Sequence, residues 1–279
     1  LSTYWIFGNH PNTVVWRCQI KEFTKEGLID SLIKIRNMGW IKSSRGKNQG
    51  AVGNTLEDLL GIEENNLPIS NAAEWELKAQ RENTSSLTTG FHLEPSPKAF
   101  KFVPQILLPN YGWPHQKAGI SYPADELSFR QTINTVSRTD RGFGVVINNL
   151  QRKIEVSFDY LKVSPRHTDW LESVEKRIGL KELNPQPYWG FDDVFFALGA
   201  KLKNCFYVKA KCKIVDGIEY FWYDKIFMLS QLSQTKFLTA LSHGNVLVDF
   251  DARTGHNHGT KFRSKKDILT ELYATKVII

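Results

Sequence analysis

A carboxylate and a lysine sit two residues apart in a segment whose pattern is that of a strand. From residue 74 to residue 79, charged and apolar side chains alternate, which predicts a half-buried strand with Glu76 and Lys78 side by side on its charged face, pointing into a solvent-filled space. A carboxylate can hold Mg²⁺, which polarises a phosphoryl oxygen and activates water, and a lysine can orient that water. The alternative is that the two side chains form an exposed ion pair with no catalytic role, since the Glu-x-Lys pattern often occurs by chance.

Longer strings around this pair carry a family resemblance. In chain order they are GWIKS (39–43), GNTLEDLLGIEENNLPISNAAEWELKAQR (53–81), TSSLTTGFHLEPSP (84–97) and HNHGTKFR (256–263). Together they resemble the MvaI/BcnI restriction endonuclease family, relatives of the mismatch-repair nicking enzyme MutH in the PD-(D/E)xK nuclease superfamily. The resemblance implies a Mg²⁺-dependent catalytic site in which Glu76 and Lys78 are the ExK pair and Glu57 is the additional acidic residue of MutH-like enzymes.

One position departs from the family pattern. The resemblance places the family's metal-binding Asp on Asn71, so that Asn71 and Glu76 are the expected metal ligands. An amide oxygen can coordinate Mg²⁺ but brings no negative charge, which weakens metal binding and the activation of water. Three interpretations stay open: an inactivating change, a natural deviation, or a shifted alignment in which Glu64 or Glu74 supplies the carboxylate.

A polar run towards the end of the sequence contains the side-chain types that read base pairs. Residues 249–263, DFDARTGHNHGTKFR, follow an apolar strand pattern. Arginine can donate two hydrogen bonds to guanine and aspartate can accept one from cytosine, so this mixture suits G·C-rich DNA. In the family that the chain resembles, the equivalent segment reads the bases. The resulting DNA-binding candidates are Asp251, Arg253, His256 and His258, with His92 near the active site and with Lys261 and Arg263 as phosphate contacts. For the two late histidines the alternative is a zinc or structural pair, and for the basic residues it is a solvated surface charge.

The rest of the sequence predicts the elements that must position these residues. Helices are expected at 24–39, capped by Thr24 and ended by Gly39; at about 55–60, stopped by Gly61; at 169–179, capped by Asp169; and within 233–244. Strands are expected at 100–108, at 142–150 and 153–161 as a hairpin, at 204–229 as a hairpin turning at Asp216-Gly217, and at 245–253.

These elements predict an interleaved α/β (α+β) body. The resemblance implies a restriction-endonuclease-like core, with a mixed central sheet flanked by helices and the option of two lobes around a DNA cleft. Residues 1–22 are expected to be an N-terminal extension and residues 23–279 the nuclease, with a catalytic part at about 23–165 and a DNA-recognition part at about 166–279.

Composition and motifs narrow the class of protein further. The 279 residues carry a net charge of +7, which makes a polyanionic partner plausible, and they contain no apolar run long enough for a membrane span. The three cysteines form no zinc pattern, and HExxH, GxSxG, P-loop and GxGxxG motifs do not occur. The first 22 residues show no signal-peptide pattern, so the expected location is the cytoplasm.

The resulting hypothesis is a Mg²⁺-dependent type II restriction endonuclease that acts as a monomer and cuts double-stranded DNA at a short G·C-rich site. The resemblance implies an interrupted site of the CC-N-GG kind. Two alternatives stay open. One is a MutH-like enzyme that nicks a single strand, and the other is a sequence-specific DNA-binding protein whose nuclease centre is impaired by Asn71.

Overall fold

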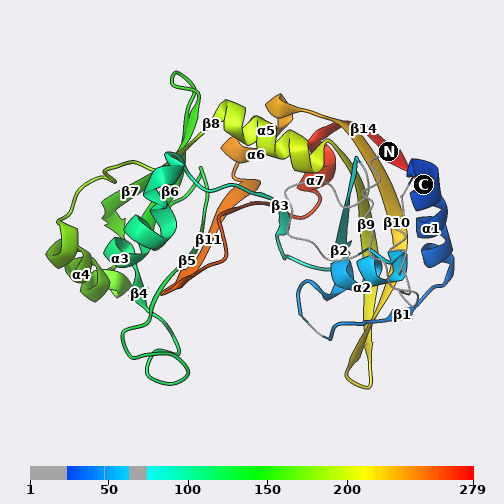
Figure 1. Cartoon of the computed structure of the whole chain (residues 1–279), viewed down its shortest axis with the longest axis horizontal. Helices are drawn as coiled ribbons and strands as arrows, with labels where there is room; N and C mark the ends of the chain where they lie inside the picture. The colour runs from blue at the N-terminus through cyan, green and yellow to red at the C-terminus, as the bar shows by residue number, and fades with distance from the viewer. Residues whose placement is uncertain (1–23, 47, 63–73) are drawn as a thin grey trace, which may run out of the picture.

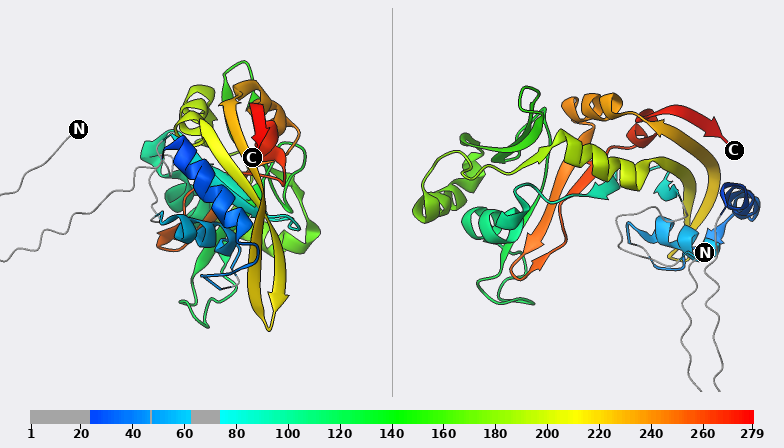
Figure 2. Two further views of the ribbon diagram at one scale, coloured as in Figure 1. Left: turned by 90° about the vertical axis from the view of Figure 1, so that its right-hand side faces the viewer. Right: turned by 45° about the horizontal axis from the view of Figure 1, so that its top comes forward.

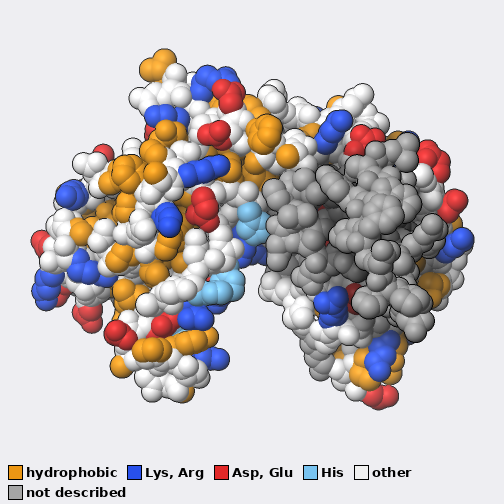
Figure 3. Space-filling model, in the orientation of Figure 1, with side chains coloured by type: hydrophobic (Ala, Val, Ile, Leu, Met, Phe, Trp, Pro, Cys, Tyr) orange, Lys and Arg blue, Asp and Glu red, His pale blue; other side chains and the backbone are white. Residues whose placement is uncertain are grey.

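Two lobes stand on either side of a hollow that opens downwards in Figure 3, and Figure 1 shows the elements of each lobe in the same view. The computed structural model describes residues 24–46, 48–62 and 74–279, which form three β-sheets with helices packed against them. The sequence prediction of a mixed α+β body with two lobes is therefore confirmed for the described part of the chain.

Sheet A forms the lobe that carries Glu76. Its strands follow the order β1-β10-β9-β2, and β14 pairs with β10 on the side. They span β1 (Ile41–Lys42), β2 (Trp75–Arg81), β9 (Asn204–Val215), β10 (Ile218–Leu232) and β14 (Tyr273–Ile278). Strand β2 runs parallel to β9, whereas the other pairs are antiparallel, so the central sheet is mixed, as predicted.

Two amphipathic helices cover one face of sheet A. Helix α1 (Lys25–Asn37) begins after Thr24, whose side chain accepts a hydrogen bond from the Gly27 amide at 3.1 Å. Helix α2 (Ala51–Leu60) ends at Gly61, which adopts the left-handed conformation that favours glycine. Trp75 and Leu77 of β2 are buried in the same cluster as the apolar faces of these helices. Because alternate residues of a strand point to opposite faces, Glu76 and Lys78 lie on the other side of the sheet.

Sheet B lies between sheet A and the far lobe, and all its strands are antiparallel. The order is β3-β13-β11-β5-β4, with β12 paired to β11. The strands span β3 (Thr88–His92), β4 (Trp113–Pro114), β5 (Leu127–Ile133), β11 (Val246–Arg253), β12 (His256–Asn257) and β13 (Lys261–Ser264). The predicted strand 245–253 is β11, preceded by α6 (Gln234–Ser242) as expected.

Sheet C and its helices complete the far lobe. The sheet contains β6 (Arg141–Asn148), β7 (Lys153–Val163) and β8 (Tyr188–Gly190). Around it lie η1 (Lys98–Phe100), the π-helix η2 (Val103–Leu107), α3 (Leu108–Tyr111), η3 (Pro165–His167) and α4 (Thr168–Ile178). Helix α5 (Phe191–Leu202) contacts β8, β3 and β2 and so connects the lobes, as the views in Figures 1 and 2 show. The short helix α7 (Ile268–Glu271) precedes β14.

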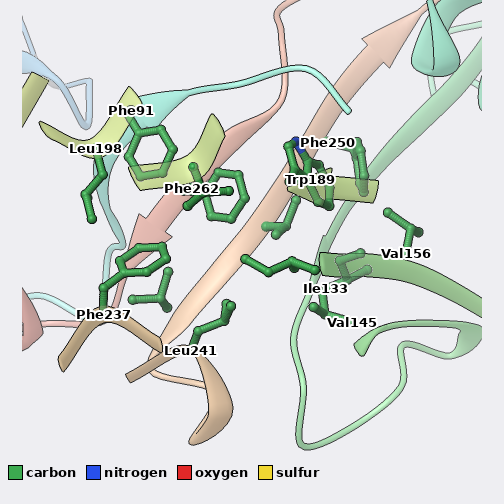
Figure 4. Packing of buried hydrophobic residues seen from close by; sticks show 14 of the residues in the cluster. Phe91, Ile133, Val145, Val156, Trp189, Leu198, Phe237, Leu241, Phe250 and Phe262 are labelled. Carbon is green, nitrogen blue, oxygen red and sulfur yellow. The ribbon is translucent and has the colours of Figure 1, made fainter. Parts of the chain in front are cut away.

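The main core lies behind sheet B. Phe91 and Phe262 are partners across β3 and β13, and their rings stack with centroids 4.8 Å apart. Trp189 packs edge-on against Phe262, with centroids 5.3 Å apart, and Figure 4 shows these rings together with Phe237 of α6. The apolar residues of β5 and β11 join the same cluster, so one face of sheet B is committed to the core.

Two local predictions were wrong. Residues 100–108 are helical rather than a strand: Val103, Leu107 and Leu108 are buried at helical spacing, and an apolar run by itself does not separate the two periods. Pro104 would also remove a hydrogen bond from a strand ladder. Helix α4 begins after His167, so Asp169 is not its N-cap. Asp169 lies in the first turn, where its negative charge interacts favourably with the positive end of the helix dipole.

Sheets A and B both draw strands from before and after residue 165. The sheets therefore do not follow the expected division of the chain at about that residue. In sheet A, β2 pairs with β9, and in sheet B, β5 pairs with β11, so each pair joins strands from both parts. The assignment of catalytic and recognition roles to the two parts stays a prediction, and the proposed extension 1–22 lies outside the described residues.

Candidate active site and DNA interface

Glu76 is a buried carboxylate on the inner face of β2. Its side chain is only 1% exposed, and its Oε1 lies 2.6 Å from Lys78 Nζ. The sequence pattern predicted a charged face open to solvent, and the structure corrects that expectation. Cys205 and Tyr207 of β9, which pair with Glu76 and Lys78 and so share this face of sheet A, are buried as well. The pair is therefore a buried site rather than the exposed ion pair of the alternative interpretation.

A second lysine reaches the same carboxylate. Lys201, in the last turn of α5, places its Nζ 3.2 Å from Glu76 Oε2. Helix α5 leads directly into β9, whose first residue Asn204 pairs with Trp75 at the start of β2. The parallel pairing therefore brings Lys201 next to a residue 125 positions earlier in the chain. Spacing within the sequence did not reveal Lys201, since its position depends on β2 and β9 being neighbours.

The Glu76 carboxylate is the part of this group that would hold a divalent cation. Its oxygens are hard ligands of the kind that Mg²⁺ prefers. Each oxygen lies against an ammonium group, Lys78 at 2.6 Å and Lys201 at 3.2 Å, so a bound cation would have to share or displace these contacts. The described ranges contain no group of three or more Asp, Glu, His or Cys side chains that could hold a metal, so further ligands would have to come from elsewhere.

The other predicted catalytic residues lie in different situations. Glu57 is half-buried on α2, the helix that packs against β2. Asn71 and its possible substitute Glu64 lie outside the described residues. Glu74, the second possible substitute, is 63% exposed and lies 3.7 Å from Lys203. The structure thus brings Glu76, Lys78 and Lys201 together and leaves the role of Asn71 as a prediction.

The face of sheet B turned away from the core is polar, and we call it the polar face. On β5 and β11 the core residues Phe129, Ile133, Val248 and Phe250 alternate with polar ones, so the polar residues share the opposite face. The polar face comprises His92, Arg130, Thr132, Asp249, Asp251, Arg253, Lys261 and Arg263. It therefore holds five of the seven residues that the sequence nominated for DNA binding.

Ion pairs cross the strands of the polar face. Asp251 Oδ1 accepts a hydrogen bond from Arg130 Nε at 2.7 Å, and Asp251 Oδ2 lies 3.6 Å from Lys261 Nζ. Burial alone would raise the pKa of Asp251, but the hydrogen bond and charge of Arg130, with the charge of Lys261, bring it below its ordinary value. Arg263 donates to Asp249 at 3.1 Å. These contacts hold charged side chains in defined positions.

Arg253 pairs with Glu126 rather than with an aspartate of the polar face. Its Nη1 donates to Glu126 Oε1 at 3.0 Å, and its guanidinium lies 4.7 Å from the centre of the Tyr122 ring. Glu126 is 4% exposed. A base contact by Arg253 would have to use the donors that Glu126 does not occupy.

His92 connects the polar face with the buried carboxylate. It pairs with Lys261 across β3 and β13. Its pKa is lowered, mainly by partial burial and then by the charges of Lys261, Lys78 and Lys201. The charges of the two lysines beside Glu76 reach His92, which places this end of the polar face on the side of the carboxylate.

The two late histidines lie on a short turn beside this face. His256 and His258 are both exposed, with ring centroids 4.2 Å apart. Glu94 holds the base of the turn: it accepts hydrogen bonds from the amide and hydroxyl of Thr260 at 2.9 Å and 3.1 Å and from Asn257 at 3.4 Å. No metal-binding group of three occurs in the described ranges. Figure 3 shows histidine side chains gathered at the hollow between the lobes.

A mixed sheet with a buried Glu-x-Lys pair, opening beside a sheet of aspartates and arginines, defines a nuclease-like site next to a surface suited to DNA. A family model for the MvaI/BcnI restriction endonuclease family matches residues 29–273. The chain belongs to this family, and it is therefore a type II restriction endonuclease, a site-specific nuclease that binds DNA. The resemblance seen in the sequence is confirmed.

A solved structure supports the fold. The chain is similar to restriction endonuclease MvaI in a complex with its cognate DNA substrate, with a TM-score of 0.71 and 22% identity over 92% of this chain and 99% of that one. The structure of MvaI in the absence of DNA matches with a TM-score of 0.48 and 22% identity, over 90% and 98% of the two chains. A search of curated proteins found no match. No helix in the described ranges is long and apolar enough to cross a membrane.

Proposed function

We propose that this restriction endonuclease is Mg²⁺-dependent, acts as a monomer, and hydrolyses both strands of double-stranded DNA at a short G·C-rich site of the CC-N-GG kind. The observation that carries the proposal is the buried Glu76 carboxylate between two lysines, next to a polar face of aspartates and arginines. Cognate DNA bound to the similar MvaI supports double-stranded DNA as the partner.

Each residue of the buried group has a role in this proposal. Glu76 would hold the metal, with Asn71 as the second ligand that the family resemblance implies. Bound Mg²⁺ would polarise the phosphoryl oxygen and lower the pKa of a water molecule. Lys78 would orient the attacking water, and Lys201 would offset the negative charge that develops on the phosphate. Both lysines lie within 3.2 Å of the carboxylate, so each is close to the position where the metal and the phosphate would bind.

Supercoiled plasmid incubated with Mg²⁺ tests the reaction. Discrete linear fragments are expected, and sequencing their ends would identify the target and the position of the cut. Nicked circles alone would favour a MutH-like nickase. Absence of cutting together with a specific gel shift would favour an impaired nuclease, an alternative that Asn71 keeps open because an amide brings no charge to the metal.

Substitutions separate catalysis from binding. Glu76→Gln or Lys78→Ala should abolish cleavage and leave specific binding in Ca²⁺ nearly unchanged, because neither residue lies on the polar face. Glu82→Gln is the matched control, since Glu82 follows the same strand and pairs with the exposed Lys225 at 2.5 Å. Equal losses of binding and cleavage for Glu76→Gln would show a structural ion pair instead. Sedimentation of the protein with and without a target duplex tests the monomer.

A further inference from the structure

Arg130 is an exposed arginine in the middle of the polar face, and sequence analysis did not single it out. It lies on β5 directly opposite Asp251 of β11. Its side chain is 66% exposed although it is held by an ion pair. A long side chain that is both exposed and held in place loses little conformational entropy when it binds a partner.

Asp251 leaves the end of the guanidinium free to bind. Arg130 Nε and Nη2 both point to Asp251 Oδ1, at 2.7 Å each. A guanidinium has five N–H donors in a planar fork, so Nη1 and the second hydrogen of Nη2 remain available. Two donors side by side match the O6 and N7 acceptors of guanine in the major groove.

The neighbouring arginines of the polar face are held more tightly by protein groups. Arg253 is turned to the buried Glu126 and lies over Tyr122. Arg263 is 22% exposed and donates both to Asp249 and to the carbonyl of Leu87. Of the three, Arg130 has the most exposed side chain, at 66% against 33% for Arg253 and 22% for Arg263.

We propose that Arg130 reads a guanine of the target through a bidentate contact, with Asp251 as the positioning residue that orients its guanidinium. The inference rests on the proposed function, since it requires a sequence-specific complex with double-stranded DNA. It adds one specificity-determining residue and identifies the base class that this residue recognises.

The test compares Arg130→Ala with Arg166→Ala in the full chain. Arg166 is the matched control, because its side chain is also 66% exposed and also pairs with an aspartate, Asp140, yet it lies on η3 of the far lobe. The wild-type target is first selected from a pool of randomised duplexes in Ca²⁺, which permits binding without cutting. Each variant is then titrated against duplexes in which every base pair of the target is changed singly.

Arg130→Ala should lose on the order of ten- to a hundredfold discrimination at one G·C pair and keep its preferences elsewhere. Arg130→Lys should lose much of the same discrimination, because lysine keeps the charge without the planar fork. Asp251→Asn should relax the same base pair, and the double variant should relax it little further than Arg130→Ala. Arg166→Ala should match the wild type.

Two results would overturn the inference while leaving the proposed function standing. Arg130→Ala could keep full discrimination against a target that the wild type selects, or it could weaken binding to every duplex by one factor, as a phosphate contact would. If the wild type selects no sequence at all, the proposed function fails, and the role of Arg130 fails with it.

Discussion

Removing the charge of Lys201 tests whether the buried carboxylate depends on two lysines. Lys201→Met keeps most of the aliphatic stem and leaves Glu76 with Lys78 alone. At an effective dielectric constant of about 20, ion pairs at 2.6 Å and 3.2 Å correspond to gross attractions of roughly 6 and 5 kcal/mol. Desolvation cancels much of this, and breaking a buried pair completely costs about 3–5 kcal/mol. Since Lys78 remains, we expect a loss of about 2 kcal/mol in the free energy of unfolding without metal.

Lys203→Met is the matched control for this change. Lys203 lies two residues further along and pairs with Glu74 at 3.7 Å, but both side chains are more than 60% exposed. An exposed pair of this kind contributes about 0–1 kcal/mol. The contrast between the two variants therefore isolates the effect of burial.

Denaturant unfolding in EDTA measures both losses, and a double-mutant cycle identifies their cause. In a Glu76→Gln background the carboxylate charge is gone, so Lys201→Met should cost much less than in the wild type. In cleavage assays with Mg²⁺, Lys201→Met should slow the reaction by about ten- to a hundredfold if its charge offsets the charge of the transition state. Equal costs for Lys201→Met and Lys203→Met, or a cost unaffected by Glu76→Gln, would refute the reasoning.

Three further predictions concern the metal, the turn and the histidine. Asn71→Asp should raise cleavage most at low Mg²⁺, as a Mg²⁺ titration on plasmid would measure, because a carboxylate strengthens the site; unchanged cleavage would move the role to Glu64 or Glu74. Glu94→Gln should place an amide N–H against the donors of Thr260 and cost about 1–3 kcal/mol in unfolding free energy, and single-substituted duplexes should show weaker base discrimination with the salt slope unchanged. The pKa of His92 is lower in the folded chain than in the unfolded chain, so the unfolded chain takes up a proton at His92 more readily. His92 therefore makes the free energy of unfolding fall as the pH drops from about 7 through the unfolded pKa of histidine, near 6.5. His92→Gln should flatten that dependence in denaturant titrations, whereas an unchanged slope would assign it to other groups.

Local signals in the sequence predicted β2, β9, β10 and β11 near the site, but not β3, β5, β13 or α5. The alternation from residue 74 predicted β2, Thr24 and Gly61 marked helix ends, and Asp216-Gly217 marked the turn of the β9–β10 hairpin. Each of these signals works within a few residues, through backbone conformation or the direction of side chains. The family resemblance added what periodicity alone does not supply, namely that Glu76 and Lys78 form a nuclease pair.

The tertiary structure decided which distant residues meet. Glu76 is buried because other segments cover its face of sheet A, and Lys201 reaches it only because β9 pairs in parallel with β2. The orientation of Arg253 depends on Glu126, which lies 127 residues earlier. Arg130 gained its position from its register opposite Asp251. Local spacing describes the direction of a side chain within its own element, whereas its partners depend on which strands become neighbours when the chain folds.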